Sequence, residues 1–205
     1  MITVDRILDC EPFLRDVQGV IFDLDDTLYS EKEYVKSGYA AVAAAFPCVK
    51  DMQRRLWAAF ENKLPAIDAV LEQEGLLCEK ARALQIYRAH TPSIRLYPGA
   101  LELLHRIKQT KKLGMITDGR PEGQRAKILA LGIEPLFDAI IVTDELGGAE
   151  YRKPNETAFR LMQKKLQIPF ESLVYIGDNM KKDFTAPKAL GMQSIYFSNK
   201  EGLYF

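Results

Sequence analysis

The stretch Gly19-Val20-Ile21-Phe22-Asp23-Leu24-Asp25-Asp26-Thr27-Leu28 joins a short apolar run to three carboxylates. A run this short, rich in Val, Ile and Phe, predicts a buried parallel strand whose carboxyl end carries the acids. Asp23 and Asp25 are two positions apart, so in an extended backbone their side chains share a side and can converge on one ligand. Carboxylates this close repel unless a proton, a metal cation or a lysine shares the site. The same residues could instead cap a helix or form a turn, as Asp and Thr often do.

The composition restricts the class of protein. A chain of 205 residues is long enough for one large domain, or for a main domain that carries a smaller insertion. It is 47% hydrophobic and 27% charged, which is ordinary for a soluble globular protein. Because 28 Lys and Arg balance 28 Asp and Glu, the charge predicts neither a nucleic-acid surface nor a membrane anchor.

The cysteines and the apolar runs indicate in which compartment of the cell the protein is located. Cys10, Cys48 and Cys78 are widely spaced and form no Cys-x-x-Cys pair, which indicates neither a disulfide framework nor a zinc site. The most apolar short run, residues 40–46, is too short to cross a bilayer, and the first residues lack the apolar core of a signal peptide. We therefore expect a cytoplasmic protein that has neither a membrane nor a nucleic acid as partner.

Beyond the first strand the chain contains two kinds of sequence. Residues 29–97 are rich in Ala, Lys, Glu, Gln and Arg, and their apolar residues recur at helical spacing. We predict about four helices there, separated at Pro47, Pro65 and Gly75. After residue 98 a helix leads into predicted strands at 112–117, 137–142, 173–176 and 192–197, which alternate with predicted helices at 121–131, 155–166 and 180–190. This alternation predicts an α/β fold with a parallel sheet and helices on both faces, and residues 1–16 are left as a lead-in.

Polar residues follow the other predicted strands, and in open α/β sheets ligands bind beyond the carboxyl ends of the strands. These residues are Thr117, Asp118 and Gly119 after the second strand, Lys153 before Pro154, and Asp178 and Asp183 after the fourth. A phosphoryl group needs this combination, because a carboxylate can be the nucleophile, a hydroxyl can bind a phosphoryl oxygen, and a lysine with a divalent cation can neutralise charge. Oxygen ligands favour Mg²⁺ as the cation. Each segment alone could be a turn or a solvated lysine, but four in order at strand ends favour one site.

Four segments resemble the motifs of the haloacid dehalogenase superfamily, in its phosphatase branch. They are Asp23-Leu24-Asp25-Asp26-Thr27-Leu28, Ile116-Thr117-Asp118-Gly119, Lys153-Pro154 and Gly177-Asp178-Asn179-Met180-Lys181-Lys182-Asp183. The resemblance implies a Rossmann-like parallel core, residues 1–28 and 98–205, with a helical cap domain inserted at 29–97. Gln124 and Lys127 add a resemblance to pyrimidine 5′-nucleotidases and N-acylneuraminate-9-phosphatase, which usually carry Asn where this chain has Asp118.

The resemblance implies catalytic roles for four residues. Asp23 would be the nucleophile, and Asp25 would protonate the leaving alcohol and then activate water as the base. The dehalogenases themselves lack an acid at the position of Asp25, so this residue favours phosphate esters over haloacids. Thr117 would hold a phosphoryl oxygen, and Lys153 would offset charge on the nucleophile and the phosphoryl group.

The resemblance also implies binding roles. The substrate-binding residues would be Thr117, Asp118 and Gly119, and the Mg²⁺ ligands would be Asp23, the backbone carbonyl of Asp25 and Asp178, with Asp183 as active-site support. The expected function is Mg²⁺-dependent hydrolysis of a small phosphomonoester, a sugar, sugar-acid or nucleotide monophosphate, through an aspartyl phosphate.

Three other readings remain open. A phosphomutase or a phosphonate hydrolase would use the same scaffold, and a mutase would have to keep water away from the aspartyl phosphate. A signalling receiver domain also pairs acids with Thr and Lys, but its phosphorylated Asp lies mid-chain and it has no large helical insertion. A non-catalytic binding protein could keep the fold without the activity.

Overall fold

The computed structural model describes residues 1–203, and the chain divides into two compact units. Unit 1 comprises Met1–Glu31 and Arg95–Phe205, and unit 2 comprises Lys32–Ile94. Within residues 1–203, no helix combines the length and the apolar character needed to cross a bilayer.

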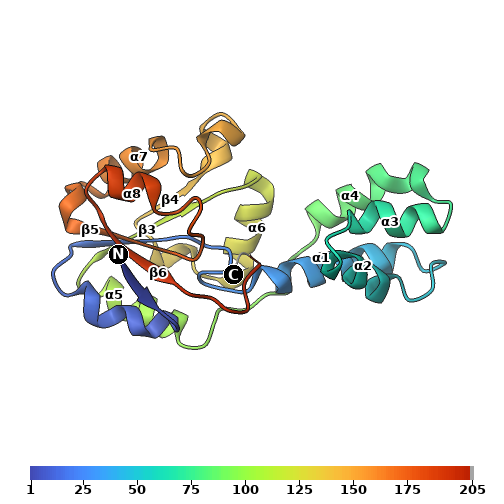
Figure 1. Ribbon diagram of the computed structural model, residues 1–205, viewed down its shortest axis with the longest axis horizontal. Helices are drawn as coiled ribbons and strands as arrows, with labels where there is room; N and C mark the ends of the chain where they lie inside the picture. Colours follow the sequence, from blue (N-terminus) through green and yellow to red (C-terminus); the bar gives the residue numbers. More distant parts are fainter. Residues whose placement is uncertain (204–205) are drawn as a thin grey trace. The chain divides into compact units, whose positions relative to one another are not determined.

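Unit 1 is built on one six-stranded parallel sheet (Figure 1). Its strands are β1 (Ile2–Val4), β2 (Gly19–Phe22), β3 (Lys112–Thr117), β4 (Ala139–Val142), β5 (Leu173–Gly177) and β6 (Gln193–Phe197). The order across the sheet is β1-β6-β5-β2-β3-β4, so β2 lies between β5 and β3. Phe22, the last residue of β2, pairs with Ile176 and with Met115, which brings the carboxyl ends of three strands together. The parallel sheet confirms the predicted fold class.

Helices cover both faces of this sheet (Figure 1). The 3₁₀ helix η1 (Ile7–Leu14) and α5 (Ala100–Lys108) pack together on one face, while α7 (Thr157–Leu166) and α8 (Thr185–Ala189) lie on the other. Ile21 of β2 is fully buried and belongs to the same hydrophobic core as Phe159 of α7. The remaining elements are α6 (Pro121–Leu131) and the short 3₁₀ helices η3 (Glu134–Leu136), η4 (Thr143–Leu146), η5 (Ala149–Tyr151) and η6 (Phe170–Ser172).

Two segments of unit 1 differ from the sequence-based prediction. Residues 1–16, left as a lead-in, contain β1 and η1, and Thr3 of β1 pairs with Tyr196 of β6. The predicted helix at 180–190 is wrong over its first half, because the α-helical part is only Thr185–Ala189. There the side-chain oxygen of Asn179 accepts a hydrogen bond from the backbone N–H of Lys181. The carboxylate of Asp183 accepts one from the backbone N–H of Asn179. Such side-chain to backbone hydrogen bonds compete with a helix.

Unit 2 contains four α-helices, as predicted: α1 (Glu31–Ala45), α2 (Met52–Glu61), α3 (Ala66–Gln73) and α4 (Lys80–Ala89), with the 3₁₀ helix η2 (Leu77–Glu79) before α4. Val42, Leu56, Leu71 and Ala83, one from each α-helix, are fully buried in one hydrophobic cluster. Unit 2 therefore has a core of its own. The prediction that it acts as a cap stays a prediction.

The two ends of the inserted segment are joined within unit 1. Tyr29 forms an antiparallel bridge with Leu96. The backbone N–H of Tyr97 donates to the carbonyl of Leu28 at 2.9 Å. The chain therefore leaves unit 1 and returns to it at neighbouring points.

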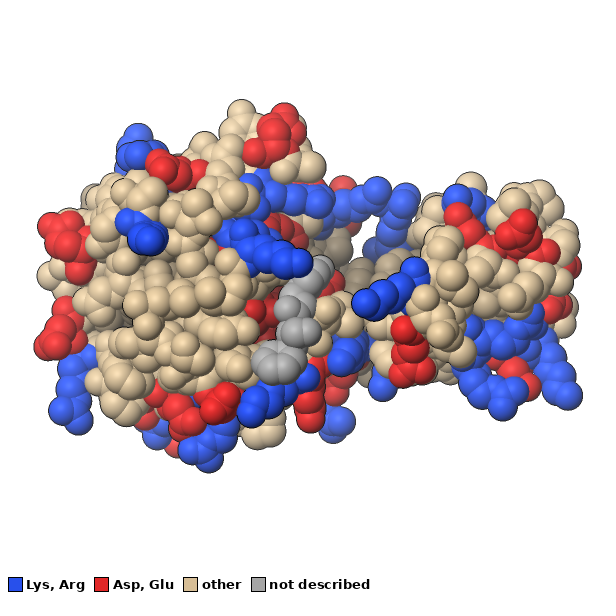
Figure 2. Space-filling view, viewed as in Figure 1, with Lys and Arg blue, Asp and Glu red and all other residues tan. Residues whose placement is uncertain are grey.

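Basic and acidic side chains are interspersed over the face that Figure 2 shows. The equal numbers of the two kinds, 28 each, agree with this mixture. Within the described residues on that face, no extended basic surface stands out.

Candidate active site

Asp23 and Lys153 form a buried ion pair at the carboxyl end of β2. The backbone N–H of Asp23 donates to the carbonyl of Ile176 at 2.9 Å, which continues the pairing of β2 with β5 by one residue. Lys153 Nζ lies 2.6 Å from Asp23 Oδ1, and its side chain is fully buried. The two residues are 130 positions apart in sequence, so the fold brings them together.

Lys153 has two further partners, Asp183 and Tyr175. Its Nζ lies 2.8 Å from Asp183 Oδ1 and 2.9 Å from the Tyr175 hydroxyl, which in turn donates to Asp183 at 3.3 Å. Burial opposes the charge, but Asp183 and Asp23 raise the pKa of Lys153 well above its usual value. Lys153 is therefore an ammonium held by three oxygen atoms.

Three carboxylates gather at this point. Asp23, Asp178 and Asp183 are buried, and one oxygen of each lies within 4.8 Å of the others. Burial, together with the nearby carboxylates of Asp23 and Asp183, raises the pKa of Asp178 to about 8. Burial also raises the pKa of Asp23 to about 6, although Lys153 acts to lower it. A buried set of hard oxygen ligands with more negative charge than Lys153 can balance fits a divalent cation such as Mg²⁺.

This crowding predicts a pH-dependent stabilisation by Mg²⁺. The pKa values of Asp23 and Asp178 are raised in the folded state, so their contribution to stability is present at low pH and is lost as the pH rises through about 6 and about 8. In EDTA we expect the melting temperature to fall between about pH 5 and about pH 8. Added Mg²⁺ should raise it more at the higher pH, because metal ligands must be deprotonated. Thermal unfolding with Mg²⁺ or EDTA measures both effects.

Asp178→Asn is the matched variant for this measurement, because it removes one carboxylate with little change of shape. We expect it to reduce the Mg²⁺-induced rise in melting temperature sharply. An undiminished rise would mean that the ion binds elsewhere.

Asp25 is held by three donors. Lys127 Nζ lies 2.7 Å from its Oδ1, Gln124 Nε2 lies 2.8 Å from its Oδ2, and the Tyr29 hydroxyl donates to Oδ1. Burial acts to raise the pKa of Asp25, but Lys127, Tyr29 and Gln124 together lower it below its usual value. Asp25 is therefore a carboxylate in this state and can accept a proton.

Thr117 and the two residues after it end β3 beside these groups. Thr117 is fully buried, and its hydroxyl accepts a hydrogen bond from Gln124. Gly119 has a φ of 138°, a backbone conformation that favours glycine. Asp118 Oδ1 accepts from the Thr143 hydroxyl at 3.0 Å and from the backbone N–H of Lys153 at 3.1 Å. The Asp118 carboxylate thus fixes the loop after β3 to the Lys153 segment.

The carboxylate of Asp118 is paired with a cation in this structure. Lys182 Nζ lies 3.1 Å from Asp118 Oδ2. The fourth motif supplies this lysine, so its ammonium group offsets the charge of the Asp118 carboxylate. All predicted site residues lie at the same edge of the sheet, and the roles assigned to them stay predictions.

Several residues that contact the site carry no motif that would identify them from the sequence. Tyr175 lies on β5 two residues before Gly177, and Tyr29 follows Asp25 by four residues. The sequence gives Gln124 and Lys127 only a resemblance to known phosphatases, without a role at the site. Their spacing of three residues on a helix places them on one face, and that spacing was the available signal.

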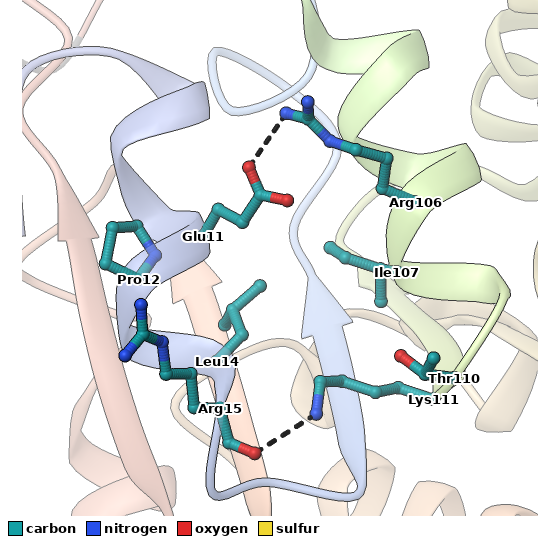
Figure 3. Close-up of a pocket in the computed structure, with 8 residues that line it drawn as sticks. All are labelled: Glu11, Pro12, Leu14, Arg15, Arg106, Ile107, Thr110 and Lys111. Carbon is teal, nitrogen blue, oxygen red and sulfur yellow. Dashed lines mark hydrogen bonds and ion pairs between the residues drawn. The ribbon is translucent and has the colours of Figure 1, made fainter.

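A hollow lies away from these residues, between η1 and α5 (Figure 3). Its cavity volume is about 450 Å³. Arg106 binds Glu11 at 2.8 Å, and Lys111 donates to the carbonyls of Arg15 and Val17. Lys111 directly precedes β3, so this hollow lies at the amino end of the strands, and the candidate site lies at the carboxyl end.

This chain is similar to known proteins in sequence and in fold. A family model described as "Haloacid dehalogenase-like hydrolase" matches residues 20–197. "Glyceraldehyde 3-phosphate phosphatase" of Pyrococcus abyssi is 33% identical over 199 residues, which cover 88% of this chain and 81% of that protein. "Pyrimidine 5'-nucleotidase YjjG" of Escherichia coli is 24% identical over 196 residues, covering 87% of this chain and 85% of that protein. The crystal structure of the HAD-hydrolase YfnB from Bacillus subtilis bound to magnesium shares the fold, with a TM-score of 0.64, 21% identity and 89% of both chains covered.

Proposed function

We propose that this chain, which belongs to the haloacid dehalogenase-like hydrolase family and is an enzyme, is a Mg²⁺-dependent phosphatase acting on a small phosphomonoester through an aspartyl phosphate. The observation that carries the proposal is the buried contact of 2.6 Å between Lys153 Nζ and Asp23, beside the carboxylates of Asp178 and Asp183. The names of the relatives from Pyrococcus abyssi and Escherichia coli support a small phosphorylated substrate. A cytoplasmic location is part of the proposal.

In the first step Asp23 attacks the phosphorus atom. A bond forms between a carboxylate oxygen of Asp23 and phosphorus, and the ester bond between phosphorus and the alcohol oxygen breaks. The leaving oxygen takes the electron pair of the broken bond and a proton from Asp25, and Asp25 has taken up that proton beforehand, from solvent or from the water of the preceding turnover. Thr117 holds a phosphoryl oxygen, and the Lys153 ammonium offsets negative charge as nucleophile and phosphoryl group approach each other.

In the second step Asp25 acts as a base. It takes a proton from water, and the water oxygen attacks the phosphorus of the aspartyl phosphate. The bond between phosphorus and the Asp23 oxygen breaks, so the carboxylate is regenerated and inorganic phosphate is released. The protonated Asp25 is then ready for the next leaving group.

Asp23, Asp178 and the backbone carbonyl of Asp25 would hold the Mg²⁺ ion. Bound there, the ion would supply positive charge that offsets the charge of the phosphoryl group. Asp183 already binds Lys153 and the backbone N–H of Asn179, so we assign it to support of the lysine.

Phosphate release from a panel of monophosphates tests this proposal. The panel contains glyceraldehyde 3-phosphate, pyrimidine nucleoside monophosphates, hexose phosphates and a sugar-acid phosphate, each with Mg²⁺ and with EDTA. We expect Mg²⁺-dependent release from at least one member. A folded protein that binds Mg²⁺ but releases no phosphate would contradict the proposal. Isomerisation of a sugar phosphate without release would show a phosphomutase instead.

A further inference from the structure

The inward face of α6 carries polar residues where apolar ones would be expected. Gln124 and Lys127 are 3% and 5% exposed, and they share this face with the buried Ile128. A helix that packs on a core normally presents an apolar stripe to it. An amide or an ammonium buried in that place is costly unless its hydrogen bonds are satisfied. Their partners therefore indicate what these two residues do.

The two residues form hydrogen bonds with Asp25 and with each other. Lys127 Nζ binds Asp25 Oδ1 at 2.7 Å and Gln124 Oε1 at 2.7 Å, while Gln124 Nε2 binds Asp25 Oδ2 at 2.8 Å. Lys127 fixes the orientation of the Gln124 amide, because its ammonium donates to the amide oxygen. The reversed amide would turn its NH₂ group toward this ammonium and its oxygen toward the Asp25 carboxylate. Each oxygen of Asp25 thus has its own donor from α6.

The two oxygens of Asp25 are not equivalent. Oδ1 accepts from Lys127 and from the Tyr29 hydroxyl, which occupies both of its lone pairs. Among the described residues, Oδ2 accepts only from Gln124, so one lone pair of Oδ2 is left for another group.

We propose that Gln124 and Lys127 are positioning residues that orient Asp25 so that Oδ2 is the oxygen that exchanges protons with the leaving alcohol and then with water. This inference rests on the proposed phosphatase function. In the first step the bond from Oδ2 to hydrogen breaks as the alcohol O–H bond forms. In the second step a water O–H bond breaks as the bond from Oδ2 to hydrogen forms again.

Two esters with different leaving groups separate positioning of Asp25 from a general structural role. An alkyl phosphate leaves as a strongly basic alkoxide and needs a proton, whereas p-nitrophenyl phosphate leaves as a stable phenolate and does not. For Lys127→Met we expect kcat/KM to fall by about 10- to 100-fold for the best alkyl phosphate of the panel. For p-nitrophenyl phosphate we expect it to change by less than about 3-fold, because kcat/KM covers only the steps up to cleavage of the ester.

The second step gives an independent readout. Both esters pass through the same aspartyl phosphate, and a misplaced Asp25 slows the attack of water on it. Rapid mixing of Lys127→Met with p-nitrophenyl phosphate should therefore show a burst of p-nitrophenolate of about one equivalent per enzyme, followed by a slower steady rate.

Two further variants complete the test. Arg125→Met makes a similar change on the same helix, at a cation paired with Glu145 and 41% exposed, and should behave as wild type. Tyr29→Phe removes one donor to Asp25 Oδ1 with little change of shape, and it tests the arrangement if Lys127→Met does not fold. We expect it to lower kcat/KM for the alkyl ester several-fold more than for the aryl ester.

The outcomes are distinct. Equal losses for both esters, or no loss for either, in Lys127→Met or in Tyr29→Phe would overturn the positioning role. If wild type hydrolyses neither ester with Mg²⁺, the proposed phosphatase function itself fails.

Discussion

Replacing Asp23 with Asn is expected to lower Mg²⁺-dependent phosphate release by about 10⁴-fold or more. The amide cannot form the acyl phosphate, yet it keeps the shape of the side chain at a position that is 2% exposed. Lys153 keeps Asp183 and Tyr175 as partners, so the fold should survive. Phosphate release at saturating substrate, with a melting curve of the same preparation, measures the effect.

Asp9→Asn is the matched control for that variant. It makes the same chemical change at a carboxylate on η1, and the ion-pair partner of that carboxylate is the exposed Arg6. We expect wild-type activity from it. If Asp23→Asn kept activity within about 10-fold of wild type, another group would have to be the nucleophile.

Replacing Lys153 with Met is expected to have the largest effect on stability. The substitution leaves Asp23 and Asp183 buried without their ammonium, and breaking a buried ion pair costs about 3–5 kcal/mol. Activity should fall as well, by roughly 10²- to 10³-fold, since the charge that offsets the phosphoryl group is lost.

The loss of stability in Lys153→Met should depend on pH. Because Lys153 acts to lower the pKa of Asp23, its removal raises that pKa further. A carboxyl whose pKa is raised on folding loses its stabilising contribution as the pH rises through the folded value. The difference in free energy of unfolding between Lys153→Met and wild type should thus be larger at about pH 8 than at about pH 5. Urea unfolding in EDTA measures it.

The exposed Lys164 of α7 provides the control, and Lys164→Met should change stability by less than about 0.5 kcal/mol. An equal destabilisation by Lys153→Met at both pH values would show that packing, not charge, is what Lys153 provides.

Most of the sheet was predictable from short apolar runs. The strands β2, β3, β5 and β6 are clear in the sequence because each is buried between neighbours. The prediction missed β1, because Ile2-Thr3-Val4 is too short for a recognisable period and becomes a strand only by pairing with β6. Such pairing depends on a partner far away in the sequence.

The candidate site was predictable to the extent that its residues end strands. Asp23, Thr117 and Asp178 could be placed at one edge because parallel strands end together there. The contacts around Asp25 could not be predicted, because the sequence alone does not distinguish a buried lysine on a helix from a solvated one. Lys127 shows this well, at 5% exposure and 2.7 Å from Asp25.

The bridge between Tyr29 and Leu96 bears on how such a chain can change over time. The inserted helices leave and rejoin their host at adjacent residues and possess a core of their own. Domain insertion is tolerated where the two junctions lie close together at a surface. We therefore expect that the segment at 32–94 can be exchanged for a longer, shorter or unrelated module while β2 and β3 keep their register.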